Sequence, residues 1–257
     1  MKKLLLCSMV ALAALCSNAR TSYTYGICTD NLNGVGTGVA GTNYSTAIEV
    51  PEEMAKAMQG SKLTAVSIGF YSGLSKDATI YLTYDLEAEP FYTQEETGFF
   101  KVRTFSTAQL DTPYEIEGRK FYIGYTYRQS RGSDKPIAFD AESLSGVGLF
   151  SHMAVWDDSS KPQWGEYPGY GSACIRATIE GDNMPANAVL PIGLTMPASI
   201  GVNVDFDYTV NLFNMSTEPV TAVNLSAVFG TDAPIASELT LDKPIAPMSK
   251  GSVAVKG

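Results

Sequence analysis

Short runs of alternating apolar and polar residues characterise the chain up to residue 182. Apolar side chains recur at every second position, and Gly, Ser, Asp and Pro separate the runs, which include Val66, Ile68 and Phe70; Ile80, Leu82 and Tyr84; Phe121, Ile123 and Tyr125; and Ile175, Ala177 and Ile179. A period of two is typical of a strand with one buried face. Many short strands joined by turns predict an all-β fold, with a jelly-roll-like β-sandwich over residues 20–182.

The segment PEEMAKAM at residues 51–58 is the only one with helical features. Pro51 suits the first helical position, and Glu52 and Glu53 complement the positive end of a helix. Gly60 suits its end. We therefore expect one short helix in an otherwise β-rich chain.

A change of composition near residue 182 predicts a second domain. Residues 183–200 hold three prolines and no charged residue, which is typical of a linker. Alternation then resumes with Val202, Val204, Phe206, Tyr208, Val210 and Leu212. Further strand-like runs predict an Ig-like β-sandwich over residues 201–257, with about four of the roughly seven strands that such a fold needs. We expect the polypeptide to continue beyond Gly257; the alternative is that a partner donates the missing strands.

The N-terminus has the pattern of a secretory signal peptide over residues 1–19. Lys2 and Lys3 precede an apolar run, and Ser17 and Ala19 are small residues at the expected cleavage site. The apolar run is shorter than the about 20 residues that span a bilayer, so we expect no membrane insertion. Leu15 before Cys16 is bulky where a lipoprotein needs a small residue, which makes lipidation the less favoured alternative.

Cleavage at this site would leave Cys28 and Cys174 as the only cysteines and change the formal charge from −9 to −9 − 2 = −11. An oxidising compartment permits a structural disulfide between them, and two separately buried thiols are the alternative. The acidic balance argues against a nucleic-acid partner and against anionic membrane surfaces, which both require clustered Lys and Arg.

No motif of a known reaction is present, so we expect no catalytic site within these residues. Gly36, Gly38 and Gly41 have the GxGxxG spacing, but the following TNYSTAIEV is strand-like and the glycines indicate a flexible loop. His152 is the only histidine, and no GxSxG elbow accompanies it. Cofactors are not indicated; Asp157 and Asp158 are weak candidates for calcium, and a solvated acidic turn is the alternative.

Four aromatic residues between turn residues form the strongest candidate binding site: Trp156, Trp164, Tyr167 and Tyr170. Aromatic rings in the loops of a sandwich can stack on sugar rings or anchor a protein partner. The alternative is a loop that folds over the end of the sandwich and caps its core.

The phrases AIEVPEEMAKAMQGSKLTAVSIGFY, GSACIRATIEG and VDFDYTVNLFNMSTEPV together resemble the N-terminal region of secreted multidomain surface proteins of Bacteroidetes. The resemblance implies a jelly-roll domain before Ig-like modules, a secreted or cell-surface location and further domains downstream. Neighbouring first and last strands in such a jelly roll would bring Cys28 near Cys174.

These observations predict a secreted or cell-surface, non-catalytic binding or adhesion module that recognises a glycan or a protein. One alternative is an accessory N-terminal region of a larger secreted enzyme, a protease or thioredoxin-like protein, whose active site lies beyond residue 257. Another is a structural surface subunit that a donated strand completes.

Overall fold

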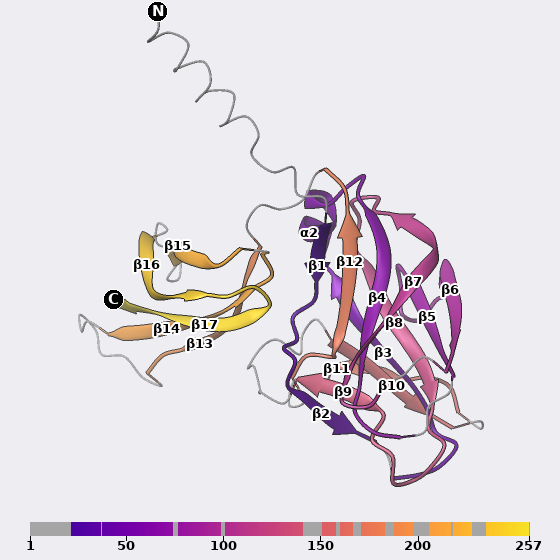
Figure 1. The fold of residues 1–257 in the computed structure, drawn as a ribbon. Coiled ribbons are helices and arrows are strands. Elements are labelled where there is room, and N and C mark those ends of the chain that lie inside the picture. Colours follow the sequence, from indigo (N-terminus) through magenta and orange to yellow (C-terminus); the bar gives the residue numbers. More distant parts are fainter. Residues whose placement is uncertain are drawn as a thin grey trace, which may run out of the picture.

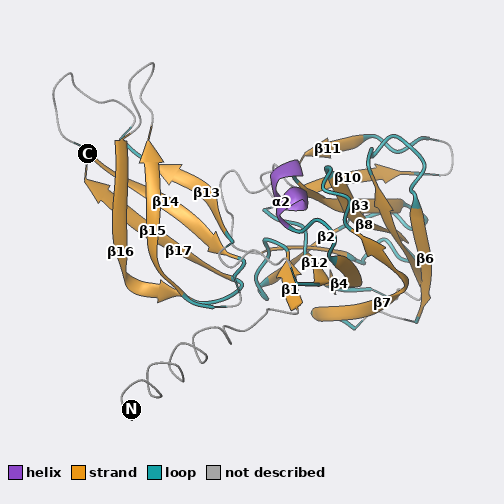
Figure 2. Ribbon diagram, turned by 90° about the horizontal axis from the view of Figure 1, so that it is seen from above, coloured by secondary structure: helices purple, strands orange, loops and turns teal. Residues whose placement is uncertain are grey.

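The protein is an all-β chain, as the alternating pattern predicts. Its computed structural model describes residues 22–36, 38–73, 77–98, 101–140, 151–157, 160–166, 171–182, 188–197, 206–216, 218–227 and 235–256. Two groups of strands lie side by side (Figures 1 and 2), and we call them the first and the second sandwich. No helix of the described residues is long and apolar enough to cross a membrane.

Two six-stranded antiparallel sheets build the first sandwich. Sheet A has the order β1-β12-β4-β9-β2, with β7 also paired to β4, from strands β1 (Ser22–Tyr25), β2 (Leu32–Val35), β4 (Lys62–Phe70), β7 (Thr104–Glu115), β9 (Ile137–Asp140) and β12 (Ile175–Glu180). Sheet B has the order β11-β10-β3-β8-β5-β6, from β3 (Asn43–Val50), β5 (Asp77–Thr83), β6 (Tyr92–Thr97), β8 (Phe121–Arg128), β10 (Ser151–Trp156) and β11 (Trp164–Glu166). Most neighbours within a sheet are distant in the sequence.

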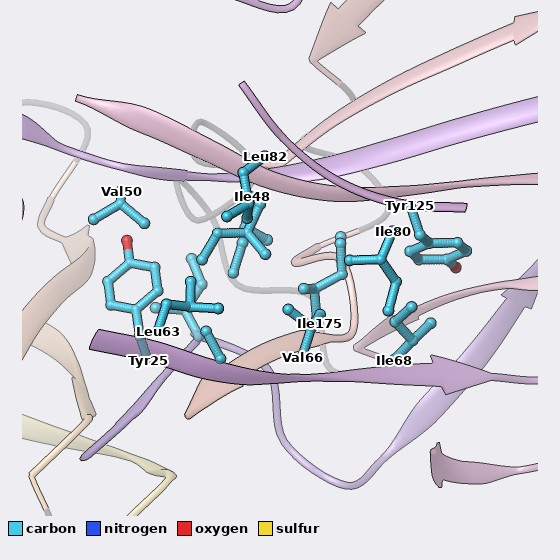
Figure 3. Close-up of a cluster of buried hydrophobic side chains, with 14 of the residues drawn as sticks. Tyr25, Ile48, Val50, Leu63, Val66, Ile68, Ile80, Leu82, Tyr125 and Ile175 are labelled. Carbon is cyan, nitrogen blue, oxygen red and sulfur yellow. The ribbon is translucent and has the colours of Figure 1, made fainter. Parts of the chain in front are cut away.

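The core of the first sandwich lies between its two sheets (Figure 3). Ile48, Ile80 and Tyr125 reach into it from sheet B, and Val66 and Ile175 meet them from sheet A. The four predicted alternating runs all contribute to this core. Tyr84 is the exception, because β5 ends at Thr83 and Tyr84 lies just beyond it, only partly buried.

The predicted helix is confirmed as α2 (Glu52–Ala57). Pro51 is its N-cap rather than its first helical residue. Glu52 and Glu53 lie in the first turn, and Gly60 just after the helix has a φ of +82°, a conformation that favours glycine. Ala55 and Met58 are fully buried, so the helix packs on the core.

The second sandwich consists of a three-stranded and a two-stranded sheet. Strands β13 (Val189–Thr195), β14 (Asp207–Asn214) and β17 (Ser249–Lys256) form the first, and β15 (Val220–Ala227) and β16 (Ile235–Ile245) form the second. Leu212 and Val253 pack between the sheets against Val220, Leu241 and Ile245.

The structure differs from the predicted linker at residues 183–200, because Val189–Thr195 form strand β13 within that range. Among the described strands, β13 pairs with β14 alone, and its register shifts between Pro191 and Gly193. An edge strand tolerates proline because one side of it needs no ladder hydrogen bonds. The second sandwich therefore begins before residue 201.

Apolar side chains of the second sandwich complete the core of the first. Phe213 and Met215 are 0 % and 1 % exposed and belong to that core, together with Ala188 and Ile192. A polar contact supports the junction: the Lys250 ammonium lies 3.4 Å from the carboxylate of Asp140, whose side chain is 0 % exposed. The two sandwiches thus share buried surface instead of being joined by a chain segment alone.

Candidate functional site

The two predicted tryptophans lie on the outer face of sheet B, away from the core. Trp164 in β11 pairs with Ala154 in β10, and Trp156 is two residues beyond Ala154. Residues that pair directly, or that lie two apart on a strand, point to the same face. The structure therefore brings Trp156 and Trp164 to one face, while Tyr167 and Tyr170 lie outside the described residues.

Trp164 covers an apolar cluster on this outer face. It packs, half-buried, with Leu86 against Ala47, Tyr81 and Tyr122, and we call these five residues the outer-face cluster. Tyr81 and Tyr122 are only 5 % and 7 % exposed. The hydroxyl groups of Tyr81 and Ser45 are hydrogen-bonded at 2.9 Å. Trp164 thus covers part of the outer face of sheet B and does not cap the core at the end of the sandwich.

Gly124 lets Tyr81 lie flat across the sheet in this cluster. A Cβ atom added at Gly124 would come within 2.3 Å of the Tyr81 ring. The close approach places the ring over Gly124 of the neighbouring strand β8, and the Tyr81 hydroxyl reaches the Thr46 carbonyl of β3, one strand further, at 3.4 Å. The outer-face cluster is therefore a packed second layer.

His152 borders the outer-face cluster. Its ring meets Tyr122 edge-on with a centroid distance of 5.4 Å, and its Nε2 lies 3.8 Å from a carboxylate oxygen of Glu49. Burial lowers the pKa of His152, although Glu166 and Glu49 act in the opposite direction. The imidazole is therefore neutral near pH 7.

The candidate calcium ligands receive no additional support. Asp157 is exposed, and its amide donates a hydrogen bond to the Ser160 hydroxyl at 3.1 Å. Asp158 lies outside the described residues. Among the described residues, no group of three or more His, Cys, Asp or Glu side chains is arranged to hold a metal ion.

A second aromatic group, which the sequence analysis missed, lies where Tyr84 and Phe91 of the β5–β6 connection meet Tyr114 near the end of β7. Tyr84 and Phe91 stack with a centroid distance of 4.3 Å and an interplanar angle of 26°. Phe91 lies 4.9 Å from Tyr114, which contacts the buried Phe121 at 5.4 Å. Phe91 remains 41 % exposed. We call Tyr84, Phe91 and Tyr114 the ring stack.

Polar groups beside the ring stack hold its tyrosine rings in position. The Arg119 guanidinium lies 3.2 Å from the centre of the Tyr84 ring, a cation–π contact, and its Nε donates to Glu117 at 3.0 Å. The Tyr84 hydroxyl also donates to Glu117 at 3.0 Å. Tyr114 then donates to the Tyr84 oxygen at 3.0 Å. Burial together with this hydrogen bond raises the pKa of Tyr114, so the hydroxyl stays protonated.

Gly118 shapes the loop that carries the polar groups. Its φ of +80° favours glycine, and it separates Glu117 from Arg119 so that both reach Tyr84. The sequence offers a weak signal for this arrangement, because Gly118 suits a turn and Tyr84 continues an apolar alternation. The contact between the two loops is set by the tertiary fold alone.

The structure brings Cys28 and Cys174 together, as the resemblance implies. Both are buried free thiols in one cluster with Ala138. The Cys28 thiol donates a weak hydrogen bond to the Ile175 carbonyl at 3.8 Å. The neighbouring Arg176 donates to the Cys28 carbonyl at 3.0 Å.

The second sandwich has two open hollows between its sheets. One of about 610 Å³ is lined by Val189, Leu212, Val223 and Leu225, among others. Another of about 670 Å³ lies where β16 and β17 diverge. Val223 and Leu225 are only partly buried there.

No family model and no curated protein matches the chain. Among solved structures it is similar to a chain described as a β-galactosidase from Bacteroides fragilis, with 12 % identity and a TM-score of 0.23 over 91 % of this chain. It is also similar to a calcium-binding mutant of β-glucuronidase 2 from Bacteroides uniformis, with 12 % identity and a TM-score of 0.24 over 93 %. The chain spans 29 % and 27 % of those two proteins. Scores this low do not indicate a common activity.

Proposed function

We propose that the protein is an exported, non-catalytic glycan-binding module and that the ring stack is its binding site. The observation that carries the proposal is the 41 % exposure of Phe91 within an ordered aromatic stack. A rigid exposed ring offers a flat apolar face on which a ligand can pack. Tyr84 and Tyr114 hold it in place before any ligand binds.

The chemistry of the surrounding groups fits a sugar. The C–H face of a pyranose is apolar and packs on an aromatic ring, while its hydroxyl groups need donors and acceptors. Arg119 and Glu117 supply both kinds of group, and each side chain is 56 % exposed beside the ring stack. A preformed stack keeps the entropic cost of binding low.

The small exposed area favours a glycan over a protein partner. A stable protein interface buries about 800 Å² on each partner around a fully desolvated centre. The ring stack offers one exposed ring with a charged pair beside it. Glu117 is engaged by Tyr84 and Arg119, which suits it to positioning a sugar hydroxyl.

A glycan array probed with the full chain, followed by calorimetry on the strongest hit, tests this proposal. We expect Phe91→Ala to weaken binding by about tenfold or more, which corresponds to ~1.4 kcal/mol. Val102→Ala is the matched control, because Val102 is an exposed apolar residue (52 %) outside the ring stack. Equal affinity of the Phe91 variant and the parent would refute the assignment, and binding only to a protein would favour the other ligand class.

Strand acceptance by the second sandwich is a second candidate function, supported by its open hollows. An added strand would cover Val223 and Leu225 and extend the exposed edge of a sheet. Light scattering over a range of concentrations would detect such assembly. A Val223→Lys variant should then remain monomeric, and a parent chain that is monomeric throughout would exclude self-assembly.

A further inference from the structure

A pair of thiols is enclosed where sheet A meets the segment between β1 and β2. Cys28 lies in that segment and is 0 % exposed, and Cys174 lies directly before β12 and is 1 % exposed. Ala138 completes the buried cluster, and partly buried Leu32, Tyr71 and Phe105 pack around it. The surroundings of the pair are mostly apolar.

The backbone holds Cys174 firmly. Its amide donates to the Ala138 carbonyl at 2.9 Å, and its carbonyl accepts from the Gly69 amide at 2.7 Å. A Cβ atom added at Gly69 would lie 2.6 Å from the Cys174 Cβ, so this approach requires glycine. Cys174 is therefore fixed by β4 and β9 at once.

Cys28 is held from the other side by polar contacts. Arg176 donates to its carbonyl at 3.0 Å, and the next amide, of Thr29, donates to Asp140 at 2.7 Å. The same Asp140 carboxylate faces Lys250 of the second sandwich. The segment that carries Cys28 thus contacts the junction between the sandwiches through Asp140.

We propose that Cys28 and Cys174 form a disulfide by exchange with a disulfide oxidant of the export compartment, and that this bond fastens the β1–β2 segment beside the junction. Both side chains pack in one small buried cluster, and the backbone contacts described above hold them there. The enclosed position implies that the bond forms during folding and is then shielded from reductants.

The thiol–disulfide exchange proceeds in two steps. The Cys28 thiolate attacks one sulfur of the oxidant, breaks its S–S bond and releases one thiolate. Cys174 then loses its proton, attacks the Cys28 sulfur and expels the second thiolate. The two cysteines are oxidised, the oxidant is reduced to two thiols, and these take up the two protons.

The electrostatics of the pair suit these roles. Burial acts to raise the pKa of Cys28, but the hydrogen bond from Cys174 and the charge of Arg176 outweigh it and lower the pKa. The hydrogen bond to Cys28 and burial raise the pKa of Cys174.

The test uses the full chain exported by a bacterial host and purified without reductant. It is unfolded, treated with N-ethylmaleimide and digested with trypsin. We expect the peptides that carry Cys28 and Cys174 to form one linked species, which separates after dithiothreitol. Two labelled peptides from protein exposed to oxidised glutathione during refolding would overturn the proposal.

A second measurement tests the fastening role. Removing a disulfide that closes so long a loop should lower Tm by about 10 to 15 °C. We expect dithiothreitol added to the unfolded protein before refolding to cause that shift in the parent and none in the double variant Cys28→Ala with Cys174→Ala. Equal Tm values for the oxidised and reduced parent would refute the fastening role. This comparison uses the parent alone, so it tests the fastening role even if the double variant does not fold.

Discussion

Phe213→Ala tests whether the second sandwich is an integral part of the core of the first. Phe213 is 0 % exposed and lies on β14, yet it belongs to the core cluster of the first sandwich. Truncating a buried phenylalanine costs about 3–5 kcal/mol through lost burial and the cavity that remains. For a chain of this length, that loss lowers Tm by about 10 °C.

The two tryptophans make the assay selective. The chain contains only Trp156 and Trp164, and both lie in the first sandwich, so tryptophan fluorescence reports the unfolding of that sandwich alone. We expect Phe213→Ala to shift this fluorescence transition, although the substitution lies in the other sandwich. Leu194→Ala is the control, because Leu194 on β13 is 56 % exposed and should leave Tm unchanged. An unchanged fluorescence midpoint for Phe213→Ala would show that the sandwiches unfold independently.

Two further outcomes follow from the outer face of sheet B. Trp164→Ala should cost about 2 kcal/mol of unfolding free energy by uncovering Tyr81 and Tyr122, yet leave glycan affinity unchanged; lost affinity with an intact fold would instead support Trp164 as a ligand contact. The lowered pKa of His152 means that the unfolded state binds the proton more tightly, so urea-unfolding free energy should fall as pH drops below about 6.5. His152→Gln should lessen that fall, even though Glu49, Glu166 and Lys120 also face the ring; an undiminished fall would contradict this cause.

The strands with one face in the core were predictable, because their apolar positions recur with a period of two. Val66, Ile68 and Phe70 all point into the core from β4. β13 was not predictable in the same way, since Pro191 and Gly193 interrupt its pattern and a register shift accommodates them. Edge strands carry weaker sequence signals because they need fewer ladder hydrogen bonds and less burial.

The candidate site was harder to predict than the fold. Trp164 is an aromatic residue of the kind that often contacts ligands. Its pairing with Ala154, however, places its side chain against the outer-face cluster. The ring stack combines Tyr84 and Phe91 of the β5–β6 connection with Tyr114 of β7. The spacing of residues within each segment does not predict this contact, because the contact depends on how the strands pair. Aromatic residues that meet only in the folded chain therefore cannot be found from their spacing in the sequence.

The positions of the ring stack and the junction assign different roles to the two sandwiches. Phe91 directly precedes β6, the edge strand of sheet B, and β6 lies on the side of the first sandwich that faces away from the second (Figures 1 and 2). Asp140 and Lys250 meet at the junction instead. A ligand on the ring stack would therefore not contact the second sandwich, which instead contributes Phe213 and Met215 to the core of the first. Phe213→Ala should accordingly lower Tm while leaving glycan affinity unchanged at temperatures where the protein is folded, which separates the core role of the second sandwich from binding.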